Sequence, residues 1–177
     1  MAESDLPRSP FARMADFVGR EPIRVLSSEE IAQTLASHRL YRETEYHEGH
    51  RANFSSVDLT GRDFSRLDLR GIKMDHAVLS GADFSGANLQ GANLIGAIAQ
   101  QARFDRADLS RAHLSGTNLV SASFENTRFA RVEMEFALMA NAVLWGARLG
   151  EADMNGAQSL FWPEPHREAP ICAARIL

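Results

Sequence analysis

Large apolar residues recur every five positions through the middle of the chain. Between residues 54 and 154, 20 of the 21 positions spaced by five hold Phe, Leu or Met, and the single exception is Ala99. An amphipathic helix would repeat its apolar face about every 3.6 residues, and a half-buried strand every 2. Neither element explains the pattern. The period therefore predicts a repeated structural unit of five residues.

The positions around each large residue are also selective. The position two before it holds alanine 14 times between Ala52 and Ala152, which indicates a cramped, inward-facing site. The position two after it holds nine of the 12 glycines, where tolerance of positive φ favours a tight bend. The position just before it is often Asp or Asn, whose side chains bond locally to backbone. Each unit is therefore predicted to contain a turn.

A chain that bends every five residues, with one large and one small side chain pointing inward, closes a square of four units. Successive coils then stack about 4.8 Å apart, so that residues 20 positions apart become neighbours. One side of the square becomes a core ladder of large side chains. Its members are Phe64, Phe84, Phe104, Phe124 and Leu144. The predicted fold is an all-β solenoid of about five coils over residues 52–157.

The same register predicts charge pairs between neighbouring coils. Asp83 and Arg103 are 20 positions apart, as are Asp108 and Arg128. Opposite charges on adjacent rungs favour this register by a small amount. We interpret these pairs as structural.

The pattern Ala-Asp/Asn-Leu/Phe-x-Gly, as in ADFSG (82–86) and ANLQG (87–91), resembles the pentapeptide-repeat family. The resemblance covers residues 52–157 and implies a right-handed quadrilateral β-helix. The preceding segment SSEEIAQTLASHRLYRE, residues 27–43, looks like the helical leader found before the coils in many bacterial members. The resemblance is specific for the fold, whereas one fold of this kind carries many functions.

Residues 26–51 are predicted to form an N-terminal capping helix. Ser27 has the features of an N-cap residue and Glu30 those of its capping-box partner. The helix is expected to run to about Tyr46, and Gly49 then lets the chain turn into the first coil.

The remaining residues flank this organisation on both sides. Residues 1–25 are expected to be flexible or draped over the coils. Residues 158–177 break the period and contain three prolines, so they are predicted to form a C-terminal cap or tail. Leu160–Trp162 are expected to plug the last coil.

Composition narrows the classes of function. A chain of 177 residues with 45% hydrophobic residues suits one domain, and its net charge of -4 argues against binding nucleic acid or an anionic membrane surface. No segment has the pattern of a signal peptide or a membrane span. The single cysteine, Cys172, excludes an internal disulfide or a multi-cysteine zinc site. We therefore expect a cytoplasmic protein.

No catalytic, cofactor-binding or metal-binding residues are predicted. Catalysis needs titratable groups that converge in a pocket sheltered from water, and coils filled by their own side chains do not provide one. His47 and His50, with Glu43 and Glu48 nearby, form a cluster without a strong zinc spacing. We interpret this cluster as a solvated helix end and expect no enzymatic activity.

Apolar residues at outward positions indicate a candidate binding surface. They gather on the wall whose buried centres run from Leu59 to Met139, and on its adjoining corner. The members of this candidate partner-binding wall are Val78, Ile95, Ile98, Phe136 and Leu138. An exposed apolar patch normally marks an interface. We expect this patch to be covered either by residues 1–25 of the same chain or by a protein partner or second subunit. A smaller pair, Val143 and Trp145, is expected to be covered by the C-terminal tail.

The leading hypothesis is a non-enzymatic protein–protein interaction scaffold that binds a protein partner or forms a homodimer. The resemblance implies an alternative, since some pentapeptide-repeat proteins mimic DNA and bind type II topoisomerases, protecting them from quinolones or inhibiting them. It also implies dimerisation in some members through the C-terminal segment. Mimicry of DNA needs a strongly acidic surface, whereas residues 52–157 hold 12 acidic and 10 basic side chains.

Overall fold

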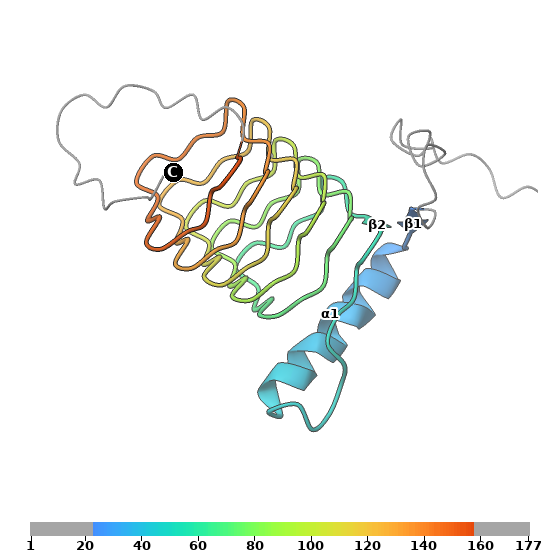
Figure 1. Ribbon diagram of the computed structural model, residues 1–177. Coiled ribbons are helices and arrows are strands. Elements are labelled where there is room, and N and C mark those ends of the chain that lie inside the picture. The colour runs from blue at the N-terminus through green and yellow to red at the C-terminus, as the bar shows by residue number, and fades with distance from the viewer. Residues whose placement is uncertain (1–22, 158–177) are drawn as a thin grey trace, which may run out of the picture.

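The computed structural model describes residues 23–157, which form a stack of coils with a helix across one end (Figure 1). Strand β1 spans Arg24–Val25, helix α1 spans Ser28–Glu43 and strand β2 spans Val57–Asp58. Elsewhere in residues 52–157 the backbone alternates between turns and single β-bridges. Among the described residues, no helix is both long and apolar enough to cross a membrane.

Parallel β-bridges join residues 20 positions apart, so each coil takes 20 residues. Asp63 bridges to Asp83, which bridges in turn to Arg103. Backbone hydrogen bonds follow the same register, because Asp83 N–H donates to the Arg62 carbonyl at 2.9 Å and Phe84 N–H to the Arg103 carbonyl at 2.7 Å. Each side of a coil reaches a turn after a single bridge, which leaves no room for long strands. The chain is therefore a β-solenoid, as the five-residue period predicts.

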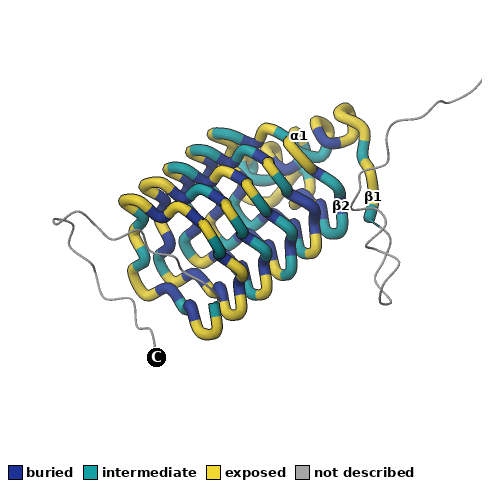
Figure 2. Tube along the Cα trace, turned by 90° about the horizontal axis from the view of Figure 1, so that it is seen from above, coloured by how far each residue is buried: buried dark blue, intermediate teal, exposed yellow. Residues whose placement is uncertain are grey.

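The repeated large side chains fill the inside of the coils, and Figure 2 shows buried and exposed positions alternating along every coil. On one side, phenylalanines of successive coils stack nearly parallel, with ring centroids 5.1, 5.0 and 5.1 Å apart. These rings belong to Phe64, Phe84, Phe104 and Phe124. Leu144 lies at the next position and is 8% exposed. Stacked rings at this spacing contribute packing beyond simple burial.

The corners of the coils use left-handed backbone. Gly86 adopts φ 68°, and residues other than glycine do the same at several corners, including Arg106 at 60° and Phe136 at 56°. The Asp or Asn before each buried centre supports the turn from outside. For example, Asp63 Oδ1 accepts a hydrogen bond from Ser65 N–H at 2.8 Å. The local backbone bonding predicted for these side chains is therefore present.

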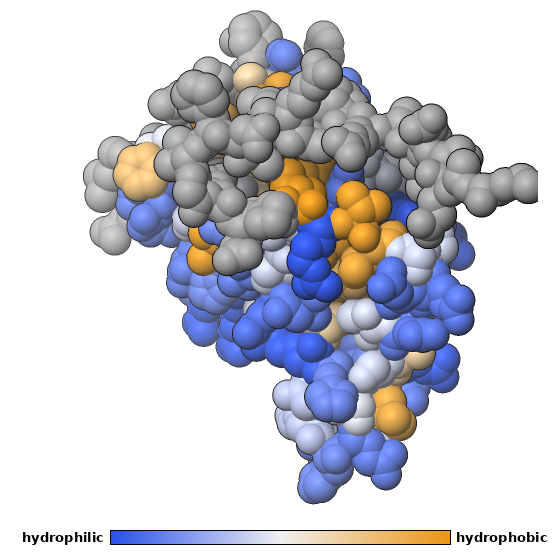
Figure 3. Space-filling model, turned by 90° about the vertical axis from the view of Figure 1, so that its right-hand side faces the viewer, coloured by the Kyte–Doolittle hydropathy of each residue, from blue (hydrophilic) through white to orange (hydrophobic). Residues whose placement is uncertain are grey.

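Helix α1 lies against the first coil. Ser27 Oγ accepts a hydrogen bond from Glu30 N–H at 3.2 Å, and the Glu30 carboxylate accepts one from Ser27 N–H at 2.7 Å, which completes a capping box. Ile31 belongs to the hydrophobic core, and Leu26 and Leu35 pack against it. Viewed from this end, polar side chains cover most of the visible surface and apolar ones gather in its upper part (Figure 3).

The helix ends at Glu43, earlier than the predicted Tyr46. Glu45 and Tyr46 adopt φ values of 52° and 76°, which cannot continue a right-handed helix. Gly49, at φ 73°, then directs the chain into the first coil. A Cβ atom at Gly49 would lie 2.2 Å from the Ser37 carbonyl oxygen, so this turn requires glycine.

Strand β1 adds one further rung at the helical end. Arg24 pairs in parallel with Val57 of β2, and Arg24 N–H donates to the Ser56 carbonyl at 2.8 Å. Arg24 and Val25, the end of the segment predicted to be flexible or draped over the coils, are therefore paired with the first coil. The other predictions for the chain ends, including the C-terminal tail, concern residues 1–22 and 158–177 and lie outside the described residues.

Candidate partner-binding surface

The candidate wall follows one outward column of the solenoid. Parallel bridges link the column in the order Asp58, Val78, Ile98, Asn118 and Leu138. Beneath it lie buried centres that run from Leu59 to Met139. The column carries no charged side chain after Asp58. This side of the solenoid is therefore uncharged along its outward column from the second coil onward.

The wall residues differ widely in exposure. Phe136 is 67% exposed, Ile95 40% and Leu138 38%, while Ile98 is half-buried. Three of the candidate residues thus present substantial apolar surface. Two of these three belong to the same late coil, so the exposed surface is weighted toward the C-terminal end of the wall.

Val78 does not contribute to an exposed surface. Its side chain is fully buried although it is not part of the hydrophobic core cluster. The hydroxyl of Ser80, in the same coil, is also buried and has no hydrogen-bond partner in the described part of the chain. The predicted exposure of Val78 is therefore wrong, because a repeat pattern gives the direction of a side chain and not its burial. The prediction that residues 1–25 cover the wall concerns mainly residues outside the described range.

A second exposed pair lies close to the end of the wall. Val143 and Trp145 are 42% and 71% exposed, and the prediction that the C-terminal tail covers them concerns residues outside the described range. With Phe136 and Leu138 they form what we call the apolar band, four large apolar side chains within one coil. Leu138 lies in the column of the wall, whereas Val143 bridges to Ser123 in the next column. The band thus turns a corner of the solenoid, which column-by-column sequence analysis did not reveal.

Phe136 lies on the outside of the coil, at one of its corners. Its backbone is left-handed, at φ 56°, a conformation that costs a residue other than glycine about 1–3 kcal/mol. Its ring lies against Gly156 of the next coil, since a Cβ atom there would be 2.6 Å from Phe136 Cδ1. Glycine at position 156 therefore makes room for the exposed ring.

The histidine cluster near the end of α1 makes only local contacts. His47 Nδ1 lies 2.8 Å from the Thr44 carbonyl, and His50 N–H donates to Ser37 Oγ at 2.9 Å. Across residues 23–157, no three His, Cys, Asp or Glu side chains come together in a way that would hold a metal ion.

His38 is a buried residue that sequence analysis did not single out. Its Nδ1 accepts a hydrogen bond from Ala52 N–H at 3.2 Å, which joins α1 to the first coil. Burial holds the pKa of His38 below its ordinary value. Its position seven residues after Ile31, on the apolar side of the helix, is the signal that would have identified it.

Residues 52–91, 87–126 and 117–156 match the family model described as pentapeptide repeats (8 copies), and these matches span more than half of the chain. Among solved structures, the pentapeptide repeat protein Rfr23 from the cyanobacterium Cyanothece 51142 has a TM-score of 0.61 at 22% identity. That match covers 72% of this chain and 93% of the other, and it shows the fold alone.

Two further solved structures also match. A pentapeptide repeat protein from the Arabidopsis thaliana thylakoid lumen is 31% identical, covering 54% of this chain and 63% of that one, with a TM-score of 0.44. One from Nostoc is 27% identical, covering 56% and 78%, with a TM-score of 0.49. No curated protein sequence matches the chain.

Proposed function

The chain belongs to the pentapeptide-repeat family, and from this premise we propose that it is a non-enzymatic scaffold that binds a protein partner through the apolar band. The observation that carries the proposal is that one coil exposes four large apolar side chains, those of Phe136, Leu138, Val143 and Trp145. Exposed aromatic side chains are the usual anchors of protein interfaces, because they bury a large area while losing little conformational freedom. Trp145, at 71% exposed, has the most area to gain.

The scaffold supports such an interface by being rigid. Every coil is bonded to the next, as Phe124 N–H donates to the Val143 carbonyl at 2.8 Å and Leu119 N–H to the Leu138 carbonyl at 2.7 Å. The backbone beneath the band is therefore ordered before a partner arrives. Binding to a preorganised surface loses less conformational entropy than binding to a mobile one.

We propose a short apolar segment of another protein as the occupant. The band lies on adjoining sides of the solenoid, with Leu138 in one column and Val143 in the next. A second rigid solenoid would meet one flat side at a time, and stable homodimers bury roughly 2,000 Å² or more in total. An extended segment can follow the coil around its corner. Ile95 and Ile98, two coils earlier, offer it further apolar contact.

The alternative of a DNA-mimicking topoisomerase binder is not favoured. Mimicry requires a surface dominated by negative charge, yet acidic and basic side chains nearly balance between residues 52 and 157. Three of the outward columns carry arginine in the later coils, namely Arg103, Arg128 and Arg131. We expect no effect of the protein on gyrase supercoiling.

The test uses two leucines with the same exposed fraction. Leu138 belongs to the band and Leu67 to the first coil, and both are 38% exposed. A partner is first captured from the host, purified, and measured against variants by calorimetry. Leu138→Asp should weaken binding by at least about tenfold, as expected for a buried charge at an interface. Leu67→Asp should leave the affinity unchanged.

Two outcomes contradict the proposal. One is an affinity that Leu138→Asp and Leu67→Asp change equally. The other is a wild-type protein that sediments as a dimer and a Leu138→Asp variant that sediments as a monomer, which would identify a second copy as the occupant.

A further inference from the structure

An arginine-lined groove lies on the side of the solenoid opposite the wall. Two hollows of about 620 and 340 Å³ lie there, and Asp108 and Arg128 line both, so we call the pair the groove. Asp108 precedes Asn118, which stands between Ile98 and Leu138 in the outward column of the wall, by half a coil, and this places the groove on the opposite side. The arginines that line it are Arg106, Arg111, Arg128, Arg131 and Arg148.

The repeat holds these side chains at fixed spacing. Parallel bridges join Asp108 to Arg128 and Arg128 to Arg148, so these three outward residues stand on successive rungs about 4.8 Å apart. Arg111 and Arg131 occupy equivalent corners of neighbouring coils, at φ 61° and 58°. The cations are thus arranged in rows on a rigid backbone.

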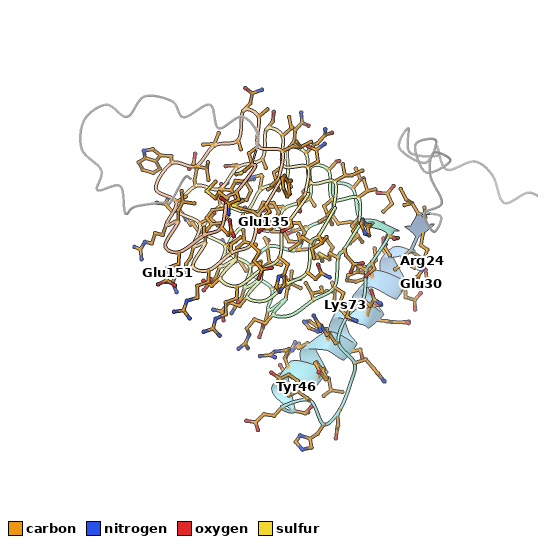
Figure 4. The ribbon with its side chains drawn as sticks, viewed as in Figure 1. Arg24, Glu30, Tyr46, Lys73, Glu135 and Glu151 are labelled. Carbon is orange, nitrogen blue, oxygen red and sulfur yellow. The ribbon has the colours of Figure 1, made fainter. Side chains whose placement is uncertain are left out.

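Only part of this positive charge is neutralised within the groove. Arg128 pairs with Asp108 at 3.5 Å, and Arg131 Nε pairs with the Glu151 carboxylate at 2.7 Å. Figure 4 shows Glu151 at the outer edge of the last coils. Five arginines against these two carboxylates leave three positive charges in a chain whose net charge is -4. In the described part of the chain, the other three arginines form no salt bridge.

Asp108 organises the floor of the groove. Its carboxylate accepts hydrogen bonds from Ser110 N–H at 2.9 Å and from Gln90 Nε2 at 2.8 Å. Burial opposes its ionisation, but these hydrogen bonds and Arg128 outweigh burial and hold the pKa of Asp108 below its ordinary value. Asp108 is therefore a carboxylate at neutral pH and pairs with Arg128. The arginines of the groove that form no salt bridge are then available to bind a ligand.

We propose that the groove binds an acidic segment of a protein, whose Asp and Glu carboxylates pair with Arg106, Arg111 and Arg148. Guanidinium groups match carboxylates in a bidentate geometry and hold them more strongly than lysine does. Nucleic acid fits less well, because the described lining of the groove has no aromatic side chain on which bases would stack. The net charge of the chain also opposes a long polyanion.

The test measures fluorescence anisotropy of a labelled Glu-rich peptide at low ionic strength. A triple variant with Arg106→Gln, Arg111→Gln and Arg148→Gln should weaken binding about tenfold or more, since three charge pairs are lost. The matched control changes Arg62, Arg66 and Arg70 of the first coil to Gln. It removes the same charge and should leave the affinity within about twofold. Melting temperatures establish that both variants are folded.

Single variants serve if the triple variant does not fold. Arg106 and Arg66 occupy equivalent corners two coils apart, with φ values of 60° and 59°, so Arg106→Gln should weaken binding and Arg66→Gln should not. Three outcomes would overturn the proposal. They are an equal loss of affinity in the groove variants and the first-coil variants, no binding of the peptide at all, and tighter binding of oligothymidylate than of the peptide. Leu138→Asp should leave peptide binding intact, so failure here is distinct from failure of the apolar band.

Discussion

The two ends of the solenoid differ in how far their core side chains are shielded from solvent. At the first coil, Phe54, Leu59 and Leu69 are at most 1% exposed, and α1 packs against the core beside them. In the last coils, Leu144 and Met154 have risen to 8% and 9% exposed. Within residues 23–157, the core is thus sealed at the helical end and slightly more exposed at the other, which we call the looser end.

The apolar band belongs to the looser end. All of its members lie in residues 136–145, whereas polar side chains cover much of the surface described at the sealed end (Figure 3). A solenoid needs its terminal coil covered, because unpaired edges and exposed apolar surface promote association. This contrast supports the proposal that a partner binds near the looser end, away from the end that α1 covers.

The largest expected effect comes from deleting the same side chain at each end. Leu69 and Leu149 share one column of the core, but Leu69 is fully buried and Leu149 only partly. Leu69→Ala should lower the free energy of unfolding by about 2–5 kcal/mol through a core cavity. Leu149→Ala should cost about half as much or less, because its site is already partly open to water. Urea unfolding measures both, and equal losses would remove the contrast between the ends.

Sequence periodicity predicts the repeating part of the fold because each position of the five-residue unit recurs many times. The position before each centre bonds to local backbone, as in Asp63, and the cross-coil pair of Asp83 with Arg103 is present at 3.6 Å. The capping box of Ser27 and Glu30 was equally predictable, since it depends on residues three apart. Local and periodic features are therefore accessible from one sequence.

Features that depend on non-repeating contacts were not predictable. Val78 is fully buried although it occupies an outward position of the repeat, and the period does not encode this burial. The end of α1 depends on the left-handed residues Glu45 and Tyr46, neither of which is glycine. His38 gains its role from Ala52, which lies 14 residues away in a different element. The binding role of the wall and of the band stays a prediction.

An intermediate effect is expected at two glycines of one column. Gly116 and Gly156 both adopt φ 66°, but a Cβ atom at Gly116 would meet nothing within 4 Å, while at Gly156 it would meet the Phe136 ring at 2.6 Å. Gly116→Ala should cost about 1 kcal/mol from the left-handed backbone alone. Gly156→Ala should cost more and displace the ring, so it should also weaken partner binding.

A double-mutant cycle with Phe136→Ala separates the two causes. Without the ring, Gly156→Ala should cost no more than Gly116→Ala in urea unfolding. An extra cost that persists would mean that the looser end is sensitive for a reason unrelated to the band.

The smallest expected effect is the loss of unfolding free energy at low pH, through His38 at the sealed end. Because burial lowers the pKa of His38 in the folded protein, the unfolded chain takes up its proton first as the pH falls. The stabilisation is therefore complete above the ordinary pKa of 6.5 and is lost progressively below it. We expect the unfolding free energy to fall between about pH 7.5 and pH 5.5, with α1 loosening from the first coil.

His38→Asn keeps an acceptor for Ala52 N–H without titrating in this range, so the pH dependence of its unfolding free energy should be flatter. Identical slopes for His38→Asn and wild type would mean that acid destabilises the protein through a group other than His38.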